Sequence, residues 1–302
     1  MENNQPPSSI SDVERETGLA KETLRVWERR YAFPQPQRDP LGERQYPAEQ
    51  VAKLRLVKRL LDLGFRPGKI VGHSIEQLQA LSSAAPGSAQ PTALQPYMEL
   101  CRSHQTEALR HALSQALATL GLSSFVINLA APLTTEVGAA WACGQLTVFG
   151  EHLYTECLQM LLRQALAAPG PGTLPPRILL TTLPQERHGL GLLMSEALFA
   201  AGGAHCISLG VQTPLQDIVE VVRSQRADIL ALSFSCAMNP RQVRDSLAEL
   251  RARLPAPTEL WAGGNNPGLN KHPPDFVRVL ELGQIGAALA DWRSRTGMAS
   301  AQ

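Results

Sequence analysis

A histidine and a carboxylate stand two positions apart in the segment Pro-Gln-Glu-Arg-His-Gly-Leu-Gly, which follows a short apolar run. The imidazole of His188 can coordinate a metal ion through one ring nitrogen, and the carboxylate of Glu186 can accept the proton on the other nitrogen and so set the tautomer. Because a single histidine–metal bond is weak, the metal has to arrive inside a cofactor that supplies its remaining ligands. An isolated loop histidine is more often simply solvated, so the interpretation depends on the elements around it.

The segment that holds His188 lies among apolar runs that alternate with amphipathic stretches. The predicted strands cover residues 177–183, 205–210, 227–235 and 259–264. The predicted helices between them cover residues 189–203, 214–225 and 240–254. This alternation predicts a doubly wound parallel sheet, which is a Rossmann-like fold. Ligands of such sheets bind outside the carboxyl ends of the strands, where residues 186–191 are expected.

Three motifs follow one another in this C-terminal part: Glu-Arg-His-Gly-Leu-Gly at 186–191, Ser-Phe-Ser at 233–235 and Gly-Gly at 263–264. In type and separation they resemble the pattern of cobalamin-binding domains, which is Asp/Glu-x-His-x-x-Gly, then Ser-x-Leu, then Gly-Gly. Ser235 stands where that family has leucine. The resemblance implies that His188 replaces the cofactor's own base as the lower cobalt ligand and that Ser233 hydrogen-bonds the displaced benzimidazole. The glycines leave space for the nucleotide tail, although the Gly-Gly pair taken singly is more often an ordinary turn. The candidate cofactor-binding residues here are Glu186, His188, Gly189, Gly191, Ser233, Ser235, Gly263 and Gly264, with His188 as the metal ligand.

The middle of the chain, residues 97–168, has apolar residues at helical spacing throughout, and its size suits a four-helix bundle. Within it Trp141 is followed, after nine intervening residues, by Glu151 and His152. This resembles the Trp-x9-Glu-His signature of the bundle that caps the corrin in light-sensing cobalamin repressors of the CarH/LitR type. The resemblance implies that Trp141 lies over the upper face of the cofactor and that Glu151 and His152 approach its adenosyl group. The alternative is that Trp141 is a core residue and Glu151 is solvated.

The N-terminal part has the pattern of a helix-turn-helix. Ser11 and Glu14 predict a capping box for a helix over residues 11–16, Gly18 predicts a turn, and a basic second helix is predicted over residues 21–31. The apolar face of the second helix consists of Leu24, Trp27 and Tyr31. A turn-rich segment that could form a β-hairpin wing follows, and then a helix over residues 47–63. Its inward residues are predicted to be Val51, Leu54, Val57 and Leu61.

The segment Leu-Arg-Val-Trp-Glu-Arg-Arg-Tyr and the later Gly-Glu-Arg-Gln-Tyr resemble the MerR-type winged helix-turn-helix, over residues 10 to about 80. Arginine can pair with guanine edges or with phosphates, so the resemblance implies a DNA-binding surface. The candidate DNA-binding residues are Arg25, Arg29, Arg30, Tyr31, Arg38, Arg44 and Tyr46. Leu24 and Trp27 are expected in the core. Arg29 and Arg30 cannot both face the groove, so one of them is expected either to hold only a phosphate or to pair with Glu28. The alternative is a helix whose charges are merely solvated.

Two stretches rich in Pro, Gly, Ser and Ala, residues 82–96 and 168–176, predict linkers. They divide the 302 residues into a winged helix-turn-helix head at 1–81, a helix-bundle cobalamin cap at 97–168 and a Rossmann-like cobalamin-binding domain at 177–302. The expected fold class is therefore multidomain α and α/β.

Charge and cysteine usage narrow the function classes. The chain has 28 Lys and Arg against 27 Asp and Glu, but residues 21–69 alone hold twelve basic and six acidic residues, which places a basic surface on the head. The five cysteines never form Cys-x-x-Cys, and this favours reduced buried thiols over disulfides or zinc. No run of about 18 apolar residues and no secretory signal is found, so a cytoplasmic chain without membrane partners is expected.

The resemblances together imply a cobalamin-dependent transcriptional repressor of double-stranded operator DNA. With adenosylcobalamin in the dark, such a repressor is a homo-oligomer, a tetramer with dimer intermediates, and light breaks the cobalt–carbon bond and releases the DNA. Light-sensing members place a histidine directly after the capping tryptophan, whereas this chain has Ala142. The alternative is therefore a light-insensitive repressor that uses methylcobalamin or another corrinoid and is relieved by an antirepressor protein.

Two other function classes are weighed against this hypothesis. A corrinoid mutase or methyltransferase needs a substrate domain, commonly a barrel of about 250 residues, and no such length remains, so the chain is not expected to be an enzyme. A drug-binding or metal-sensing MerR-type regulator is disfavoured by the motifs of the C-terminal part and by the cysteine pattern.

Overall fold

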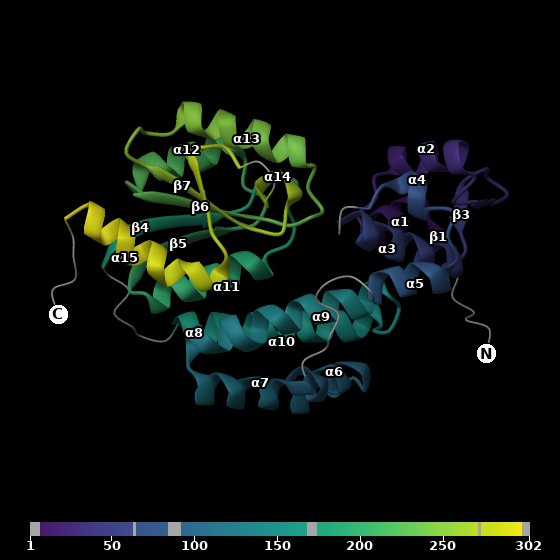
Figure 1. The fold of residues 1–302 in the computed structure, drawn as a ribbon, viewed down its shortest axis with the longest axis horizontal. Coiled ribbons are helices and arrows are strands. Elements are labelled where there is room, and N and C mark those ends of the chain that lie inside the picture. The colour runs from purple at the N-terminus through teal and green to yellow at the C-terminus, as the bar shows by residue number, and fades with distance from the viewer. Residues whose placement is uncertain (1–6, 63–64, 84–91, 168–173, 271–272, 298–302) are drawn as a thin grey trace. The chain divides into compact units, whose positions relative to one another are not determined.

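The computed structural model describes residues 7–62, 65–83, 92–167, 174–270 and 273–297 (Figure 1). The chain divides into two compact units, one of residues 1–102 with 135–151 and one of residues 103–134 with 152–302. The last two helices of the middle region, at residues 131–142 and 148–167, therefore belong partly to each unit. Among the helices of the described ranges, none is both long and apolar enough to cross a membrane.

The head is the part of the first unit from β1 to α5, and it is a winged helix-turn-helix. Its elements are β1 (Ser8–Ser9), α1 (Ile10–Thr17), α2 (Lys21–Tyr31), β2 (Gln37–Arg38), β3 (Arg44–Tyr46), α3 (Ala48–Asp62), α4 (Pro67–Ile70) and α5 (Ile75–Ser83). The strands form an antiparallel sheet in the order β1-β3-β2, with Arg38 opposite Arg44. The predicted hairpin wing is thus confirmed.

The start of α1 differs from the prediction. The capping box consists of Ser9 and Asp12: the hydroxyl of Ser9 accepts the N–H of Asp12, and the carboxylate of Asp12 accepts the N–H of Ser9. The predicted box of Ser11 and Glu14 is wrong. Pairing of Ser9 with Gln45 across the sheet holds Ser9 in extended backbone, so the helix can begin only at the next residue.

The core of the head is wider than the periodicity of α3 suggested. Leu24 and Trp27 are buried as predicted. In α3, Val51, Leu54 and Val57 are buried, but Leu61 is only half-buried, whereas Leu56 and Leu60 are fully enclosed. Because α1 and α5 both contact α3, the helix buries a broader face than a single apolar stripe.

Helices make up most of the described residues of the middle region. Its elements are η1 (Thr92–Leu94), α6 (Gln95–Arg102), α7 (Thr106–Leu120), α8 (Leu122–Phe125), η2 (Val126–Ala130), α9 (Ala131–Ala142) and α10 (Val148–Ala167). The π-helical turn η2 joins α8 to α9 without a break, so the region has four helical stretches. The turn is followed by Pro132, which lacks the N–H that an α-helix needs to continue its ladder. The fully buried Tyr154 bonds its hydroxyl to Thr134 (2.7 Å) and to the carbonyl of Ala130 (3.1 Å).

The C-terminal part of the second unit is a doubly wound parallel sheet, as predicted. The strands are β4 (Leu174–Thr181), β5 (Ala204–Gly210), β6 (Ile229–Phe234), β7 (Glu259–Gly264) and β8 (Val277–Val279), in the order β5-β4-β6-β7-β8. The helices are α11 (Leu190–Ala201), α12 (Leu215–Ser224), α13 (Pro240–Arg253), α14 (Pro267–Asn270) and α15 (Ile285–Arg295), with the 3-10 turn η3 (Leu282–Gln284). Figure 1 shows α12 and α13 on one face and α11 and α15 on the other.

The boundaries of the middle region and of the C-terminal part were predicted less accurately than their elements. Most of the two predicted linkers, residues 84–91 and 168–173, lies outside the described residues. The remainder is structured: η1 and α6 begin before residue 97, and β4 begins at Leu174, which pairs with Ala204. Neither β8 nor α15 was predicted; β8 has only three residues and no clear alternation. The five cysteines are free thiols, of which Cys101 and Cys157 are buried and the others half-buried.

The strand order determines where a ligand can bind. The chain passes from β4 to β5 on one side of β4 and then returns to place β6 on the other side. The order reverses between β4 and β6, so the crevice between the loops that follow these two strands is the expected ligand position. All six residues of β6 are buried, as expected of a central parallel strand covered on both faces.

Candidate cofactor site and nucleic-acid interface

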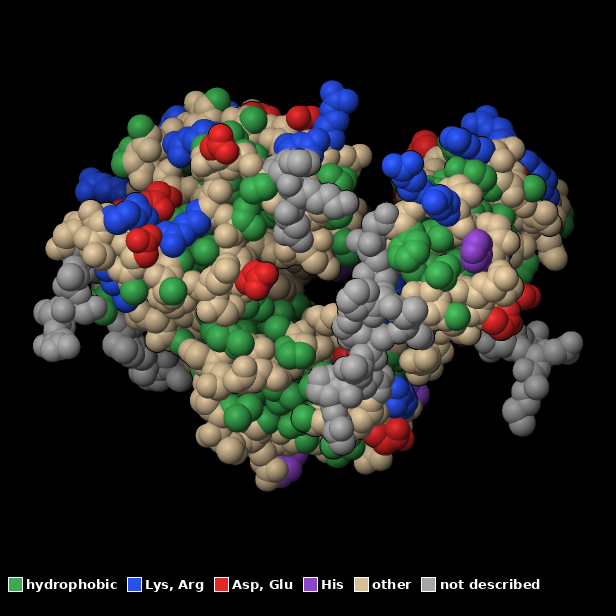
Figure 2. Space-filling model, in the orientation of Figure 1, with side chains coloured by type: hydrophobic (Ala, Val, Ile, Leu, Met, Phe, Trp, Pro, Cys, Tyr) green, Lys and Arg blue, Asp and Glu red, His purple; other side chains and the backbone are tan. Residues whose placement is uncertain are grey.

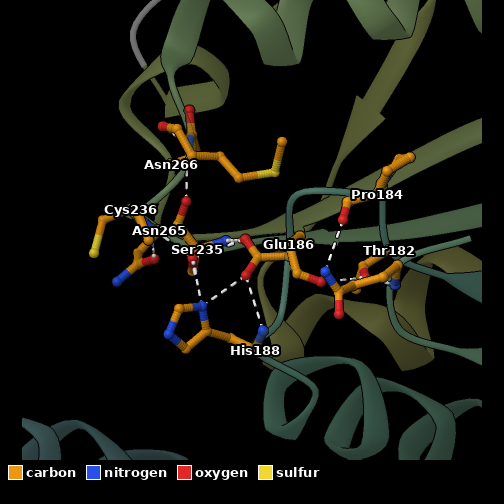
Figure 3. Close-up of polar contacts among 11 residues, drawn as sticks. Thr182, Pro184, Glu186, His188, Ser235, Cys236, Asn265 and Asn266 are labelled. Carbon is orange, nitrogen blue, oxygen red and sulfur yellow. Dashed lines mark hydrogen bonds and ion pairs between the residues drawn. The ribbon is translucent and has the colours of Figure 1, made fainter. Parts of the chain in front are cut away.

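A buried carboxylate joins the two loops at this reversal point (Figure 3). Glu186, in the loop after β4, is 1% exposed. Its Oε1 accepts the backbone N–H of His188 at 2.9 Å and lies 2.7 Å from Nδ1 of the imidazole. Its Oε2 accepts both the backbone N–H and the hydroxyl of Ser235, the residue that follows β6, each at 2.7 Å. The structure thus brings together three predicted site residues from two loops.

The charge of Glu186 determines how His188 is oriented. Burial alone raises the pKa of the Glu186 carboxyl, but the hydrogen bonds from His188 and Ser235 outweigh it and leave the pKa below its ordinary value. An ionised carboxylate can only accept hydrogen bonds, so Nδ1 of His188 must carry the proton that lies between them. In the neutral ring the lone pair is then on Nε2. The His188 side chain is 65% exposed, so this nitrogen is accessible to a ligand.

The loop of Glu186 is held by its own backbone and by the next loop. The hydroxyl of Thr182 donates to the carbonyl of Glu186 and accepts the N–H of Gln212, both at 2.8 Å. The N–H of Glu186 donates to the carbonyl of Leu183 at 2.9 Å, and the side-chain amide of Gln212 donates to the carbonyl of Pro184 at 2.8 Å. These bonds limit the positions that the Glu186 carboxylate can take.

Two asparagines that the sequence analysis missed support the other loop. The fully buried Asn266 donates its side-chain amide to the carbonyls of Ser235 (2.8 Å) and Met238 (3.0 Å). The side chain of Asn265 accepts the N–H of Cys236 at 2.8 Å. Both asparagines directly follow the Gly-Gly pair at the end of β7, and that position at a strand's carboxyl end was the signal that could have found them.

The glycines of the motifs lie where side chains would collide. Gly264 has φ of +114°, and a Cβ there would lie 2.0 Å from the carbonyl oxygen of Phe234. Gly263 and Gly264 are the last two residues of β7 and pair with β6, so they do not form the ordinary turn considered as an alternative. A Cβ on Gly191 would lie 3.1 Å from the hydroxyl oxygen of Ser233, which places these two motif residues side by side.

The three residues of the middle motif lie at the ends of two helices. Trp141 is in the last turn of α9, and Glu151 and His152 are in the first turns of α10; His152 is exposed and Glu151 half-buried. The guanidinium of Arg55, in α3, lies 5.5 Å from the centroid of the Trp141 ring. The indole N–H is buried and has no hydrogen-bond partner among the described residues. Trp141 therefore contacts the head, which the sequence analysis did not predict.

The exposed arginines of the head lie on α2 and on the wing. Arg25, Arg29 and Arg30 are exposed on α2, and Arg38 is exposed on β2 with its guanidinium donating to the carbonyl of Gly42 at 2.8 Å. Figure 2 shows Lys and Arg side chains gathered around α2 on the face in view. Tyr31 is half-buried and packs edge-on against Trp27.

Two of the predicted DNA-binding residues make contacts inside the head. Tyr46 is fully buried, and burial raises the pKa of its hydroxyl, so the prediction of a direct DNA contact is wrong. Arg44 donates from Nε to the carboxylate of Glu28 at 2.9 Å and is 25% exposed, so it holds the wing against α2. The hydrogen bond to Glu28 raises the pKa of Arg44. Glu28 therefore pairs with Arg44 and not with Arg29 or Arg30.

Comparison with known proteins assigns the head and the middle region to known families. Residues 8–73 match the model of the MerR HTH family regulatory proteins, and residues 94–165 match that of the B12 binding domain. The HTH-type transcriptional repressor CarA of Myxococcus xanthus is 30% identical over 258 residues, which cover 82% of this chain and 84% of CarA. The chain belongs to the family of cobalamin-binding MerR-type regulators that includes CarA.

The CarH repressor of Myxococcus xanthus is similar to the same extent, with 29% identity over 82% of this chain and 85% of CarH. Among solved structures, the monomethylamine corrinoid protein of Methanosarcina barkeri has 12% identity and a TM-score of 0.49, with 64% of this chain and 94% of that chain covered. That likeness is too slight to add to the assignment. A member of the CarA and CarH family is a DNA-binding transcriptional regulator and not an enzyme, and its cofactor is a cobalamin.

The residues of this family member fit a cobalamin. Ser233 is 8% exposed, and it is the last residue but one of β6. A serine hydroxyl can both donate and accept hydrogen bonds, so it can bind a polar atom of a ligand. Gly191 lies beside it without a side chain, and Nε2 of His188 is accessible at the same edge of the sheet. Gly189, where a Cβ would lie 3.2 Å from Val211, completes the loop.

Proposed function

We propose that the chain is an adenosylcobalamin-dependent, light-responsive transcriptional repressor in which His188 is the lower ligand of cobalt. The observation that carries the proposal is the pairing of Nδ1 of His188 with the buried carboxylate of Glu186 at 2.7 Å, which leaves Nε2 exposed. Carboxylate–histidine pairs of this kind orient metal-binding imidazoles and increase their basicity. Adenosylcobalamin, when bound, supplies a cobalt–carbon bond that light breaks.

The remaining motif residues have separate roles in this proposal. Ser233 binds the benzimidazole end of the nucleotide tail, and Gly191, Gly263 and Gly264 make room for the tail. The position of the Ser233 hydroxyl beside Gly191 and the close approaches at the other glycines support this assignment. Trp141, Glu151 and His152 bind the upper side of the cofactor. Their support is the Trp-x9-Glu-His pattern together with the match of residues 94–165 to a B12 binding domain.

The head binds double-stranded operator DNA through Arg25, Arg29, Arg30 and Arg38, with Tyr31 beside them. Several heads act at once, because the chain forms a tetramer through dimer intermediates when the cofactor is bound. A single small head has modest affinity, and joining heads raises the apparent affinity by orders of magnitude without any new contact. Dispersal of the oligomer in the light therefore releases the operator.

The test is reconstitution with adenosylcobalamin, followed by size-exclusion chromatography and operator binding in the dark and after green light. We expect a larger, DNA-binding species in the dark and a smaller, weakly binding one after illumination. The variant His188→Ala is expected to lose the imidazole-ligated cobalt spectrum, and His111→Ala, an exposed histidine on α7, is the matched control. Unchanged spectrum and corrinoid affinity in His188→Ala would remove the lower-ligand assignment.

One observation favours a second candidate function. Ala142 follows Trp141 at the position where light-sensing members have a histidine, and its side chain is buried at the end of α9. The candidate is a light-insensitive repressor that uses methylcobalamin or another corrinoid and is relieved by an antirepressor protein. It predicts that chromatography and operator binding are the same in the dark and after illumination, while the cofactor still binds.

A further inference from the structure

Ser235 occupies the position of the leucine in the Ser-x-Leu motif, and its hydroxyl makes contacts that a leucine could not make. The hydroxyl donates to Oε2 of Glu186 at 2.7 Å, lies 3.1 Å from Nδ1 of His188, and accepts the N–H of Ala237 at 3.2 Å. The backbone N–H of Ser235 also donates to Oε2 at 2.7 Å. A leucine would keep only this last bond. The hydroxyl is therefore a departure from the Ser-x-Leu pattern.

The Ser235 hydroxyl bonds the Glu186 carboxylate, whose movement is already restricted by its other contacts. Glu186 is enclosed, and its Oε1 is engaged by His188, so the two bonds from Ser235 determine the rotation of the carboxylate about its last torsion. Ser235 is itself held, since its carbonyl accepts the side-chain amide of the fully buried Asn266 at 2.8 Å. The order of support runs from Asn266 through Ser235 and Glu186 to His188 (Figure 3).

Loss of the hydroxyl has two physical consequences. One buried oxygen of an ionised carboxylate loses a charge-assisted hydrogen bond, which is stronger than a bond between neutral groups. The carboxylate is then freer to turn away from the imidazole, so the preference of His188 for carrying its proton on Nδ1 weakens. Since metal-binding histidines depend on such outer partners, removing one typically lowers affinity by about 10- to 100-fold.

We propose that Ser235 is a positioning residue for the cobalt ligand: its hydroxyl holds the Glu186 carboxylate in the rotation that keeps the His188 proton on Nδ1 and directs Nε2 to the cofactor. The claim about cobalt ligation rests on the proposed function. The claim about the position of the His188 proton concerns the chain without cofactor.

The first experiment uses the full chain without cofactor, labelled with ¹⁵N-histidine, at one fixed pH. The ring nitrogen shifts of His188, assigned by comparison with His188→Ala, report how the proton is divided between Nδ1 and Nε2. We expect the wild type and Ser235→Thr to favour Nδ1–H, and Ser235→Ala and Ser235→Leu to show a larger Nε2–H fraction. Ser224→Ala, which removes a hydroxyl from the end of α12, is the matched control.

The second experiment measures the same variants with cob(II)alamin by electron paramagnetic resonance. In chains labelled with ¹⁵N-histidine, cobalt bound by His188 shows a two-line nitrogen splitting and cobalt bound by the cofactor's own base shows a three-line splitting. The ratio of the two signals gives the fraction bound by His188, and a corrinoid titration gives the affinity. We expect Ser235→Ala and Ser235→Leu to bind about tenfold more weakly than the wild type, and Ser235→Thr to restore binding. Circular dichroism identifies misfolded variants, and Ser235→Ala, the smallest change, decides the result if Ser235→Leu misfolds.

The outcomes separate this proposal from the proposed function. If Ser235→Ala matches the wild type in tautomer and in cobalt ligation, Ser235 has no positioning role. If His188→Ala leaves the cobalt signal unchanged, the lower-ligand assignment is lost instead. The tautomer measurement then still decides whether Ser235 orients the imidazole.

Discussion

Oε1 of Glu186 and Nδ1 of His188 are 2.7 Å apart, and the carboxylate is 1% exposed whereas the imidazole is 65% exposed. The pair thus has one member inside the sheet and one at its surface. A buried, ionised partner can fix the direction of an exposed ring without occupying the ligand position itself. This separation of the orienting group from the binding group has consequences that mutation can test.

Glu186→Gln should weaken corrinoid binding even though the shape is nearly unchanged. An amide has one acceptor oxygen and one donor nitrogen, so it cannot accept all four donors from His188 and Ser235 that meet the carboxylate. We expect the affinity to fall by about 10- to 100-fold. Absorbance titration with cobalamin measures it, and Glu220→Gln on the exposed side of α12 is the control. Equal affinities of the two variants would contradict the orienting role.

Gly264→Ala should destabilise the sheet. A side chain at φ of +114° is strained, and its Cβ would lie 2.0 Å from the carbonyl oxygen of Phe234. We expect a loss of about 3 kcal/mol in the free energy of unfolding. Gly286→Ala is the matched control, because it lies in α15 with nothing within 4 Å of its Cβ and should cost little. Urea unfolding followed by circular dichroism compares the two, and similar midpoints would refute the steric argument.

Arg29→Ala and Arg44→Ala should differ in kind. Arg29 is exposed on α2, so its removal should weaken operator binding and reduce the slope of log affinity against log salt by about 0.9 if it contacts one phosphate. Arg44 is paired with Glu28 at 2.9 Å, so its removal should lower the stability of the head as well. The partly buried ion pair of Arg44 and Glu28 is expected to contribute about 1 kcal/mol to the free energy of unfolding. Fluorescence anisotropy with operator DNA and thermal unfolding measure the two effects.

A result in which Arg44→Ala weakens DNA binding without any loss of stability would mean that the pair with Glu28 opens on the operator. A double-mutant cycle of Glu28→Ala and Arg44→Ala isolates the contribution of the pair itself. No coupling energy in the cycle would contradict the structural role given to Arg44.

Cys206 should resist thiol reagents while the chain is folded. Burial, and secondarily the nearby Glu196, raises the pKa of its thiol from 9.0 to about 12. The folded chain then has about a thousandth of the thiolate at a given pH below 9, and only the thiolate reacts quickly. Alkylation of Cys206 followed by mass spectrometry should be much slower in the native chain than in urea. Equal rates would show that the thiol is not shielded.

The same pKa has a consequence for stability. The thiol ionises near its ordinary pKa in the unfolded chain but only near 12 in the folded one, so the proton is held more tightly in the folded state. The resulting stabilisation is complete below pH 9 and is lost as the pH rises towards 12. Cys206→Ala should remove this pH dependence, which urea unfolding between pH 8 and pH 10 can measure.

Local patterns predicted the elements well where neighbouring residues decide the backbone. The alternation of apolar runs and amphipathic stretches was enough for β4 to β7 and the helices between them, because each run has the period of its own element. The proximity of Glu186 to His188 was also predictable, since two positions in one turn cannot lie far apart. The short strand β8 has only three residues, and its weak pattern did not distinguish it from a loop.

Contacts between distant residues could not be predicted in this way. The burial of Tyr46 and the pairing of Arg44 with Glu28 depend on how the wing folds against α2, and the same motif residues would be plausible DNA contacts on an isolated strand. Ser9 and not Ser11 caps α1 because β1 pairs with β3 at that residue. Each of these outcomes was decided by a partner more than fifteen positions away.

The sequence by itself determined which chemical groups this protein has and at which strand end they stand, because residue type and backbone periodicity are local properties. Only the tertiary structure decided that the loops after β4 and β6 meet and that Ser235 therefore reaches Glu186. It also decided that Asn266 donates a hydrogen bond to the carbonyl of Ser235. The physical reason is the strand order β5-β4-β6-β7-β8. Which strands become neighbours depends on packing of the whole sheet, and that packing brings together residues 49 positions apart in the chain.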